Sequence, residues 1–478
     1  MLAVVGGYFA LLLAVAWRTS RGADNDSFFI GNRSSNWAVV AFGMVGTSLS
    51  GVTFVSVPGA VGREAFSYFQ LVLGLFAGYL VIAFVLLPIY YRKHVTSIYD
   101  FLEARLGPVS HRTGSAFFIL SRTLGATARL YLVVNILQEA ILDALGVPFG
   151  LTSAVFVAMI VAYTYQGGVK TIVWTDMLQT SCMLLGLVII SGAMLGSLHL
   201  SFGESLARLH ERGLSTIFHT DVNSASFFPK QFAAGAFIAI AMTGLDQEMM
   251  QKNISVRTLA DSQKNVVVMA VIMMGVVLLF LYLGGLLYLN APVAGVEATG
   301  DRILPATVLG DLPALVQLVF LIALVSALFP SADGAITALT SIFCIDILGL
   351  TRKPGLDEEA RKRIRHRVHI AFAAVFMLLM LVFKQADSPS MIGVILTLAG
   401  YTYGPLLGLF AFAILTRRGV RDGWVPLVAL AAPALCLWID MNQRSLLGQY
   451  RLGLEILVLN GVLTFAGLWL VSRPGPGT

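Results

Sequence analysis

Long apolar segments separated by short polar connections run through the whole sequence, and they restrict what it can fold into. Of the 478 residues, 57% are hydrophobic and only 12% are charged, whereas about 25% are charged in ordinary soluble domains. A helix of about 20 apolar residues crosses a bilayer, while the strands of a membrane β-barrel alternate over about ten residues. The sequence therefore predicts an all-α polytopic membrane protein.

We predict about 13 transmembrane helices from the apolar segments, each of which approaches or exceeds the length that a bilayer requires. The first segment lacks the basic start and the small-residue cleavage site of a secretory leader, so we interpret it as a retained helix. The predicted ranges are 2–17, 36–62, 66–91, 113–143, 149–166, 171–198, 229–253, 264–290, 311–350, 367–385, 389–415, 423–440 and 451–472.

Lys and Arg residues gather in alternate connections, which predicts the orientation of the chain. Cytoplasmic connections of membrane proteins carry an excess of these residues. If the N-terminus lies outside, the cytoplasmic connections hold most of the 32 Lys and Arg residues, including those of the basic run 351–366. We therefore expect a multi-pass protein of the plasma or inner membrane, with its N-terminus outside and its C-terminus in the cytoplasm. Topology then explains the net charge of +6, and no nucleic-acid partner is expected.

The segment 36–62 is long enough to span a bilayer, but its middle is poor in helix formers. Gly weakens a helix, and Ser and Thr compete for its backbone hydrogen bonds. Backbone groups that are freed inside a membrane must be satisfied by protein, water or an ion. We interpret the segment as an interrupted helix that forms a binding site; close packing of two helices on small residues is the alternative. The residues concerned are Gly46, Thr47, Ser48, Ser50, Gly51 and Thr53.

Five motifs carry a resemblance to a known family, and they occur in the order that the family shows. The resemblance extends over nearly the whole chain, which resembles the sodium/solute symporters and, among them, the branch that takes up sialic acid. The motifs are GTSLSGVTFVSVPG (46–59), TSIYDFLEARLG (96–107), YQGGVKTIVWTDMLQ (165–179), DQEMMQKNISVRTLADSQKN (246–265) and SADGAITALTSIFCIDIL (331–348).

The resemblance implies a core of two inverted five-helix repeats, in which the first helix of each repeat is interrupted at mid-membrane. In the second repeat the interrupted helix would be 229–253, with Thr243-Gly244 at the break. The implied divisions are a leading helix and cytoplasmic loop (1–35), the first repeat (36–198), an extracellular loop (199–228), the second repeat (229–415) and two trailing helices (416–478).

The family's shared sodium site uses carbonyl and hydroxyl oxygens of the first and eighth core helices. By resemblance these ligands correspond here to Gly46 and Leu49 in the first helix, and to Ala327, Pro330 and Ser331 in the eighth. Many members carry two adjacent hydroxyl residues in the eighth helix, whereas this chain has Pro330 at the first of them. Proline offers a carbonyl but no hydroxyl. Sodium is the coupling ion that the resemblance implies, and we expect no other metal and no cofactor.

A second cation site is also implied, because some members bind another sodium between an aspartate and the eighth helix. The corresponding residues here are Asp176, Ser331 and Asp333. Two carboxylates that face one polar space bind a cation strongly or share a proton. The alternative is that each carboxylate pairs with a basic residue such as Lys170 or Arg129.

The solute contacts are expected on the interrupted helix and its neighbours. Arg122 and Arg129 lie two turns apart on one helical face, and an Arg inside a span usually finds an anion. That anion could be a solute carboxylate or, alternatively, Glu139, Asp246 or Asp333. The resemblance to the sialic-acid branch adds hydroxyls, an aromatic ring and a glutamine, so that the predicted solute residues are Ser50, Thr53, Phe66, Gln70, Arg122 and Arg129.

These features together favour a secondary active transporter that couples sodium entry to the import of a small organic solute. An acidic sugar such as sialic acid or another carboxylate is the expected solute; oligomeric state is not predicted. The alternatives are a transporter-like solute sensor, or the same transporter coupled to protons and carrying a neutral sugar or an amino acid. A membrane enzyme would need a cluster of His or acidic residues at one water interface, and the sequence suggests no such cluster.

Overall fold

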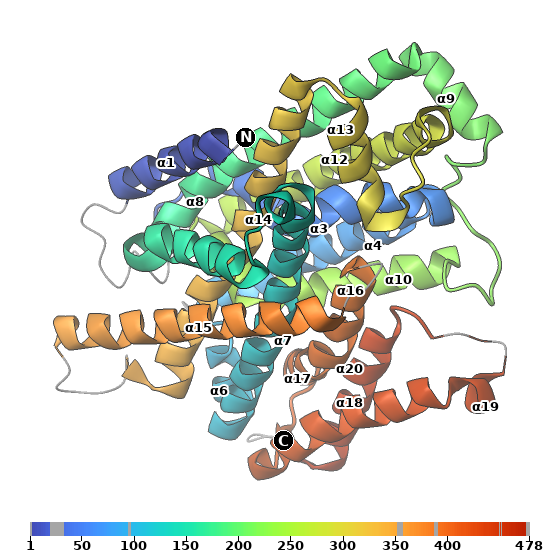
Figure 1. Cartoon of the computed structure of the whole chain (residues 1–478). Coiled ribbons are helices and arrows are strands. Elements are labelled where there is room, and N and C mark those ends of the chain that lie inside the picture. Colours follow the sequence, from blue (N-terminus) through green and yellow to red (C-terminus); the bar gives the residue numbers. More distant parts are fainter. Residues whose placement is uncertain are drawn as a thin grey trace.

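The structure, a computed structural model, describes residues 2–19, 33–93, 97–350, 357–386, 391–448, 450 and 452–474. Inside its helices, a few side chains are also outside the description, among them that of Lys170. Almost all secondary structure is helical (Figure 1). Two very short strands, β1 (Gly419–Val420) and β2 (Ser472–Arg473), form one antiparallel pair.

The first half of the chain contains helices that include several π and 3₁₀ turns (η). They are α1 (Leu2–Thr19), α3 (Trp37–Glu64), α4 (Tyr68–Val81), η2 (Ile82–Leu86), α5 (Leu87–Lys93), α6 (Asp100–Arg105), α7 (Pro108–Leu137), η3 (Gln138–Leu142), η4 (Asp143–Leu145), α8 (Phe149–Leu198) and α9 (Phe202–Glu211).

The second half begins with a helix that is interrupted near its middle. Its elements are α10 (Phe228–Ala239), η5 (Ile240–Gly244), α11 (Gln247–Ile254), α12 (Leu259–Ala294), η6 (Gly300–Arg302), α13 (Ile303–Asp311), α14 (Ala314–Ile342), η7 (Phe343–Ile347), α15 (Glu358–Ala386), α16 (Met391–Thr402), α17 (Gly404–Leu415), η9 (Asp422–Trp424), α18 (Val425–Met441), α19 (Gln443–Leu447) and α20 (Ile456–Leu470).

Membrane-spanning character is clear for most of the predicted segments. Among the described residues, 8 helices are long and apolar enough to cross a membrane, and two bent helix pairs raise the number to 10. The predicted spans 149–166 and 451–472 coincide with the shorter apolar helices Phe149–Tyr165 and Ile456–Leu470. The polytopic helical class is thus confirmed at this level, while the count of 13 and the inverted repeats stay predictions.

Two helices are longer than their predicted segments. Helical hydrogen bonding continues through both predicted ranges 149–166 and 171–198 in the single helix α8, which has 50 residues. Since one helical span of a bilayer needs about 20 residues, α8 is long enough to contain both predicted spans. Similarly, α15 runs from Glu358 to Ala386, so the described part of the inner run 351–366 continues into the following span. Residues 351–356 lie outside the described residues.

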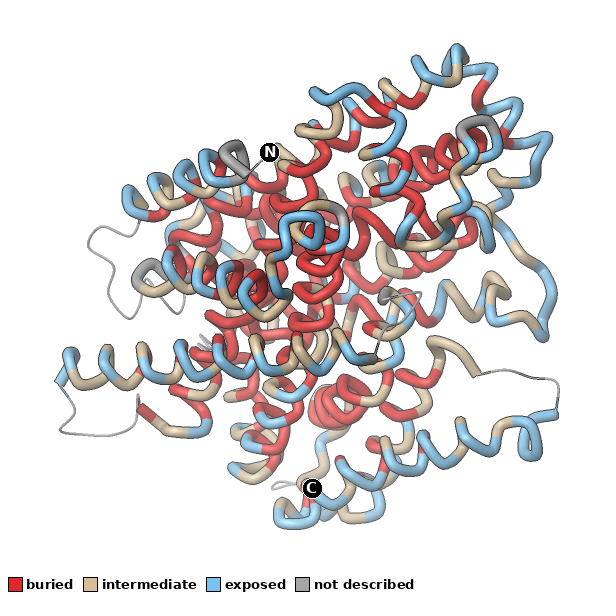
Figure 2. Tube along the Cα trace, in the orientation of Figure 1, coloured by how far each residue is buried: buried red, intermediate tan, exposed pale blue. Residues whose placement is uncertain are grey.

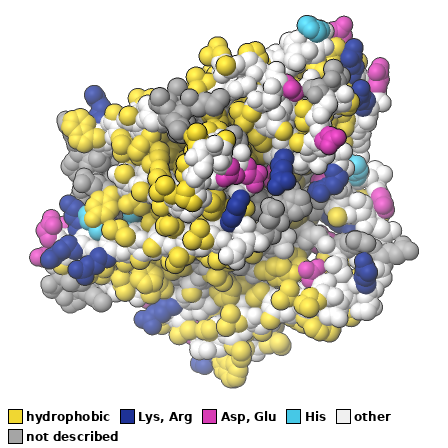
Figure 3. All heavy atoms as spheres, in the orientation of Figure 1, with side chains coloured by type: hydrophobic (Ala, Val, Ile, Leu, Met, Phe, Trp, Pro, Cys, Tyr) yellow, Lys and Arg dark blue, Asp and Glu magenta, His cyan; other side chains and the backbone are white. Residues whose placement is uncertain are grey.

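The outer surface is apolar, as expected for a chain that faces lipid. Leu470 is 86% exposed and Met441 78%. In the face that Figure 3 shows, hydrophobic side chains cover much of the surface, while charged side chains lie toward the left and right edges and in a group near the centre. Large apolar side chains that are exposed in this way suit contact with lipid.

Helix α3 lies at the centre of the molecule and positions the site. It packs against α8, α12 and α14, and most of its residues from Val40 to Val61 are buried. Asn36 caps its N-terminus by accepting a hydrogen bond from the Ala38 amide at 2.9 Å. Figure 2 shows the buried interior that surrounds this helix and the exposed outer helices.

Helices α4 and α10 pack so closely that their glycines leave no room for a side chain. A Cβ on Gly235 would collide with the Leu71 carbonyl oxygen. We predict that Gly235→Val destabilises the protein by about 1–3 kcal/mol, the usual cost of overpacking. Thermal unfolding in detergent would measure the loss.

Gly275→Val provides the matched control, because the same change on α12 meets no atom within 4 Å. Equal melting temperatures for the two variants would contradict the described packing of α4 on α10.

Candidate cation and solute site

The central helix α3 is interrupted at Ser50, within the stretch where the sequence predicts a break. Ser50 has φ 43° and ψ 169°, which is not helical. A residue other than glycine adopts such a conformation only when its surroundings hold it there, and such residues concentrate at functional sites. The predicted interruption of the segment 36–62 is therefore confirmed.

A second interruption separates α10 and η5 from α11, directly after the predicted Thr243-Gly244 break. The two halves meet at a bend of 69°. Carbonyl groups that lose their helical partners there are satisfied by buried tyrosines: Tyr90 donates to the Gly244 oxygen at 2.9 Å, and Tyr99 donates to the Leu245 oxygen at 2.8 Å. The break is thus stabilised within the protein, as the absence of water in a membrane requires.

Glycines on α3 bring the two neighbouring helices close to its interruption. A Cβ added at Gly43 would lie 3.1 Å from the Asp176 Cβ on α8. On the other side, a Cβ added at Gly51 would lie 3.6 Å from the Ala327 carbonyl oxygen on α14. The break therefore lies against the two helices that carry the predicted cation ligands.

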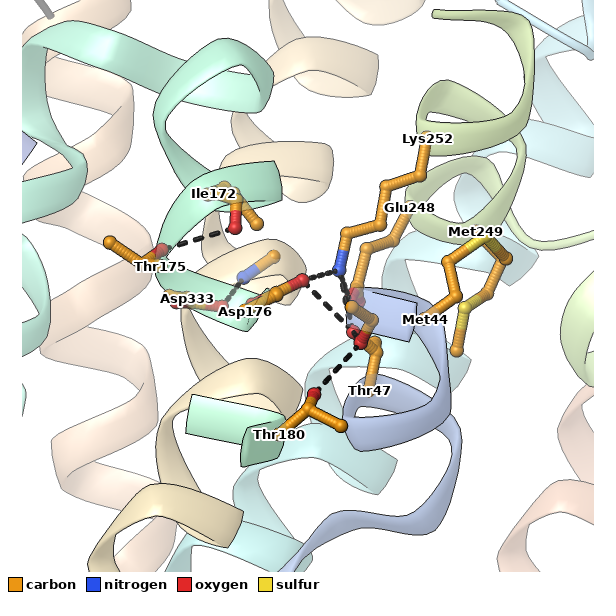
Figure 4. Close-up of polar contacts among 12 residues, drawn as sticks. Met44, Thr47, Ile172, Thr175, Asp176, Thr180, Glu248, Met249, Lys252 and Asp333 are labelled. Carbon is orange, nitrogen blue, oxygen red and sulfur yellow. Dashed lines mark hydrogen bonds and ion pairs between the residues drawn. The ribbon is translucent and has the colours of Figure 1, made fainter. Parts of the chain in front are cut away.

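A buried lysine joins three helices beside this break. The Lys252 ammonium on α11 lies 2.7 Å from the Asp176 Oδ2 on α8 and 2.8 Å from the Thr47 Oγ1 on α3. Thr47 donates to the same Asp176 oxygen at 3.1 Å, and Glu248 approaches the ammonium at 3.5 Å. Figure 4 shows Lys252 and Glu248 reaching from α11 toward Thr47 and Asp176.

Arg122 on α7 is also engaged by buried carboxylates. Its guanidinium pairs with Glu248, and its Nε lies 3.7 Å from the Asp246 Oδ2. Tyr403 donates a hydrogen bond of 2.8 Å to the same Asp246 oxygen. Of the two alternatives that the sequence leaves open for Arg122, the structure shows the internal ion pair, with Glu248 as an additional partner.

Asp333 differs from these carboxylates because no Lys or Arg of the described residues lies within ion-pair distance of it. The side chain is fully buried. Its Oδ2 accepts a hydrogen bond from Tyr163 at 2.7 Å, and its Oδ1 accepts one from the Gly334 amide at 2.5 Å. Neutral donors alone therefore hold this carboxylate.

The polar core contains more acidic than basic groups. Asp176, Asp246, Glu248 and Asp333 are all buried, whereas the basic side chains that pair with them, as far as the structure describes the chain, are those of Lys252 and Arg122. Among the described residues, the Asp176 Oδ1 and the Thr337 Oγ1 have no hydrogen-bond partner, and neither has the Gln179 amide. Buried polar atoms are rarely left unsatisfied, so these oxygens are suited to hold a cation.

A cavity of about 100 Å³ opens at the interruption of α3. Ser50, Thr53 and Arg129 contribute to its polar wall, and apolar side chains from α4, α12 and α16 form most of the rest. A larger chamber of about 330 Å³ adjoins it toward the loop 199–228, and the two share Tyr68, Leu71, Ile392 and Leu396.

Of the two arginines that line this cavity, Arg129 is the one that forms no ion pair with a described residue. It is half-buried, and no carboxylate of the described residues lies within ion-pair distance of it. Arg122 also lines the cavity but is engaged by Glu248 and Asp246. The two arginines that the sequence treats alike therefore have different surroundings.

Two of the predicted solute residues lie away from this cavity. Gln70 donates to the Ser226 carbonyl at 2.9 Å and accepts from the His219 amide at 3.1 Å. Phe66 is buried, and its own amide bonds to the Thr216 carbonyl. Both residues hold the loop 199–228 against the start of α4 and are absent from the cavity lining.

The predicted sodium ligands of α14 lie on a continuous helix. Helical structure passes through Pro330 from Ala314 to Ile342. The Ser331 hydroxyl is buried and donates to the Leu328 carbonyl at 3.0 Å, which leaves its oxygen able to accept or to bind a cation. Pro330 stands where many family members carry a hydroxyl residue, and the helix continues through it.

Sequence reasoning missed Lys252: this lysine is the last residue but one of the predicted span 229–253, and the topology argument counts it among the cytoplasmic lysines. It also missed Glu248 and the Tyr163 hydroxyl on Asp333. The signal that could have found the first two is their spacing: Glu248 and Lys252 are four residues apart on a helix and so share one face. The alternative partner Lys170 has a side chain outside the described residues.

A family model described as the sodium:solute symporter family matches residues 28–426. The chain belongs to the sodium:solute symporter family. Membership in this family supports sodium-coupled transport across a membrane. The resemblance found in the sequence implies the same activity.

Similar proteins include two bacterial sialic acid symporters. The sodium/sialic acid symporter SiaT of Proteus mirabilis is 24% identical over 444 residues, which cover 87% of this chain and 84% of SiaT. NanT of Aliivibrio fischeri is 22% identical, covering 92% of this chain and 86% of NanT. A solved structure of a Na+-coupled sialic acid symporter, substrate-bound and outward-open, has a TM-score of 0.83 at 19% identity, covering 98% of this chain and 96% of that one. This likeness shows the fold.

The Lys252–Asp176 pair yields a test of the polar core. Removing one partner of a buried ion pair leaves an uncompensated charge and costs about 3–5 kcal/mol, whereas removing both costs much less. We predict that Lys252→Met strongly lowers thermal stability and that Lys252→Met with Asp176→Asn regains much of the loss. Melting curves of both single variants and the double variant in detergent would measure the coupling.

Strictly additive effects of the two substitutions would contradict the described contact. Such additivity is expected only for residues that do not touch.

Proposed function

We propose that this protein is a sodium-coupled symporter that imports a small carboxylate solute through the cavity at the interruption of α3. The observation that carries the proposal is Arg129, a half-buried guanidinium that has no acidic partner among the described residues and lines a cavity that also presents Ser50 and Thr53. A guanidinium binds a carboxylate through two parallel hydrogen bonds. The relatives named for sialic acid symport support an acidic solute.

The size and lining of the cavity favour a compact carboxylate with an apolar portion. Its volume of about 100 Å³ is well below the roughly 300–1,000 Å³ of pockets for drug-sized ligands. Gln70, which the resemblance assigns to an acidic sugar, instead bonds the loop 199–228. Sialic acid would require this loop to release Gln70 and the cavity to open toward the larger chamber.

The proposed coupling site is formed by carbonyls of Gly46 and Leu49, carbonyls of Ala327 and Pro330, and the Ser331 hydroxyl. Sodium prefers such neutral oxygen ligands, and interrupted helices supply free carbonyls. The contact between the break and α14, shown by the approach of Gly51 to the Ala327 oxygen, supports this assignment. Bound sodium would hold α3 and α14 together and favour the solute-binding conformation.

The second proposed cation site lies between Asp176, Ser331 and Asp333. Lys252 already occupies the Asp176 Oδ2, so the cation would use the unpartnered Oδ1 of Asp176 together with Asp333. The excess of buried carboxylates over buried cations favours it. A proton could neutralise the same excess, which is the specific reason to keep proton coupling as the second candidate.

Alternating access would expose this shared site to each side of the membrane in turn. With the N-terminus outside and the C-terminus in the cytoplasm, the chamber beside the loop 199–228 faces the exterior. A solute would then pass from this chamber to the inner cavity between the side chains that line both, which are those of Tyr68, Leu71, Ile392 and Leu396.

Uptake into liposomes tests the sodium ligand. We predict sodium-dependent accumulation of short-chain carboxylates, and a roughly 10- to 100-fold weaker apparent sodium affinity in Ser331→Ala, because one interaction with a charged ion is worth about 1.5–3 kcal/mol. Ser341→Ala is the matched control: it removes a buried hydroxyl from the same helix, one that likewise bonds its own helix backbone. Accumulation driven by a proton gradient alone would favour the second candidate instead.

The role of Arg129 is tested with the same assay. Arg129→Gln should abolish carboxylate uptake while leaving sodium binding by the purified protein nearly unchanged, because the guanidinium contacts the solute and not the ion. Arg302→Gln, an exposed arginine, serves as control. Full uptake by Arg129→Gln would overturn the proposed anion site.

A further inference from the structure

Three separate segments bring a histidine and several carboxylates together away from the transport cavity. Asp100 and Glu103 come from α6, His111 from the first turn of α7, and Asp346 from η7. The sequence suggests no cluster of histidine and acidic residues at a water interface, and the structure corrects this expectation. The folding of α6 against α7 assembles the cluster.

One distance in this cluster matches the separation of two ligands on one metal ion, and a second is longer. His111 Nε2 lies 3.3 Å from Asp346 Oδ2 and 3.9 Å from Asp100 Oδ1. One donor atom from each of the three residues lies within 4.8 Å of the other two. Zinc bonds to nitrogen and oxygen measure about 2.0–2.2 Å in tetrahedral sites, which places neighbouring ligand atoms roughly 3.3–3.6 Å apart.

The hydrogen-bond geometry leaves a position open between these atoms. The His111 side chain is only 5% exposed, yet its Nε2 makes no hydrogen bond with any described residue although a carboxylate oxygen is near. Asp346 Oδ1 also has no hydrogen-bond partner in the described part of the chain. Since a proton on Nε2 would need an aligned acceptor, the imidazole nitrogen and the carboxylates are better arranged around a shared ion.

The surroundings orient the ligands as outer-shell groups of metal sites do. Glu103 Oε2 lies 3.3 Å from the other ring nitrogen, Nδ1, which favours the proton there and leaves the Nε2 lone pair for a metal. Ser97 and Ser115 donate to Asp346 Oδ2 at 2.8 and 2.7 Å. Asp100 is 32% exposed on its side chain, so an ion can enter from the adjacent water.

We propose that His111, Asp346 and Asp100 bind a divalent transition-metal ion such as Zn²⁺, with water completing the coordination. One imidazole and two carboxylates suit zinc and its neighbours in the series. The ion would tie α6 to the beginning of α7 and to η7, which directly follows α14. The site is independent of the solute cavity and of the proposed sodium ligands.

Metal titration of the purified, tag-free protein tests the proposal. Isothermal calorimetry with Zn²⁺ should show one equivalent bound, and Co²⁺ should produce the visible absorption of a low-coordinate site. His111→Ala should weaken binding at least tenfold. Asp100→Asn should also weaken metal binding. Because Asp100 is partly exposed, this variant tests the site even if His111→Ala does not fold.

His210→Ala is the matched control, since it removes an exposed histidine and should leave the titration unchanged. Equal loss in His210→Ala, equal binding by all variants, or no binding by the unaltered protein would overturn the proposal. In the last case the contacts of His111 with Asp100, Glu103 and Asp346 would serve the packing of α6, α7 and η7 alone.

Discussion

The absence of water from the membrane interior is the constraint on which this structure depends. Every charge and every freed backbone group there must find a partner inside the protein. Lys252 satisfies this requirement for three helices at once, through Asp176 at 2.7 Å, Thr47 at 2.8 Å and Glu248 at 3.5 Å. Without such pairs, an interrupted α3 could not stay buried beside an interrupted α10–α11, because both breaks expose polar groups.

The same constraint explains why the candidate transport site lies at these breaks. Backbone oxygens that leave a helical ladder become available to a cation, and the ion-paired core beside them keeps an excess of negative charge. Within the described part of the chain, Asp333 has Tyr163 and a backbone amide as its hydrogen-bond partners, while Arg129 has no acidic partner there. A cation near the first and an anionic solute near the second would complete the charge balance of one connected polar region.

Much of the fold could be predicted from sequence because it follows from local composition. Apolar length gives the spans, and the clustered small and hydroxyl residues around Ser50 give the first break. The partners of the buried charges could not be predicted in this way, since they depend on how distant helices pack. In sequence Lys252 resembles a topology-setting lysine, and the packing of α11 against α3 and α8 is what brings it to Asp176. Gln70 resembles a solute ligand in sequence, but its side-chain amide is bonded to the loop 199–228. Arg122 and Arg129 are equivalent by spacing, and what distinguishes them is the approach of Asp246 and Glu248 to Arg122.

Reciprocal linkage between sodium and solute is the most direct test of the account. Binding of labelled sodium to the purified protein would be measured with and without the carboxylate that liposomes accumulate best, and binding of that carboxylate with and without sodium. If both occupy one connected site, each must tighten the other by the same factor, since coupling free energy is reciprocal. Sodium binding that the carboxylate leaves unchanged would contradict the account.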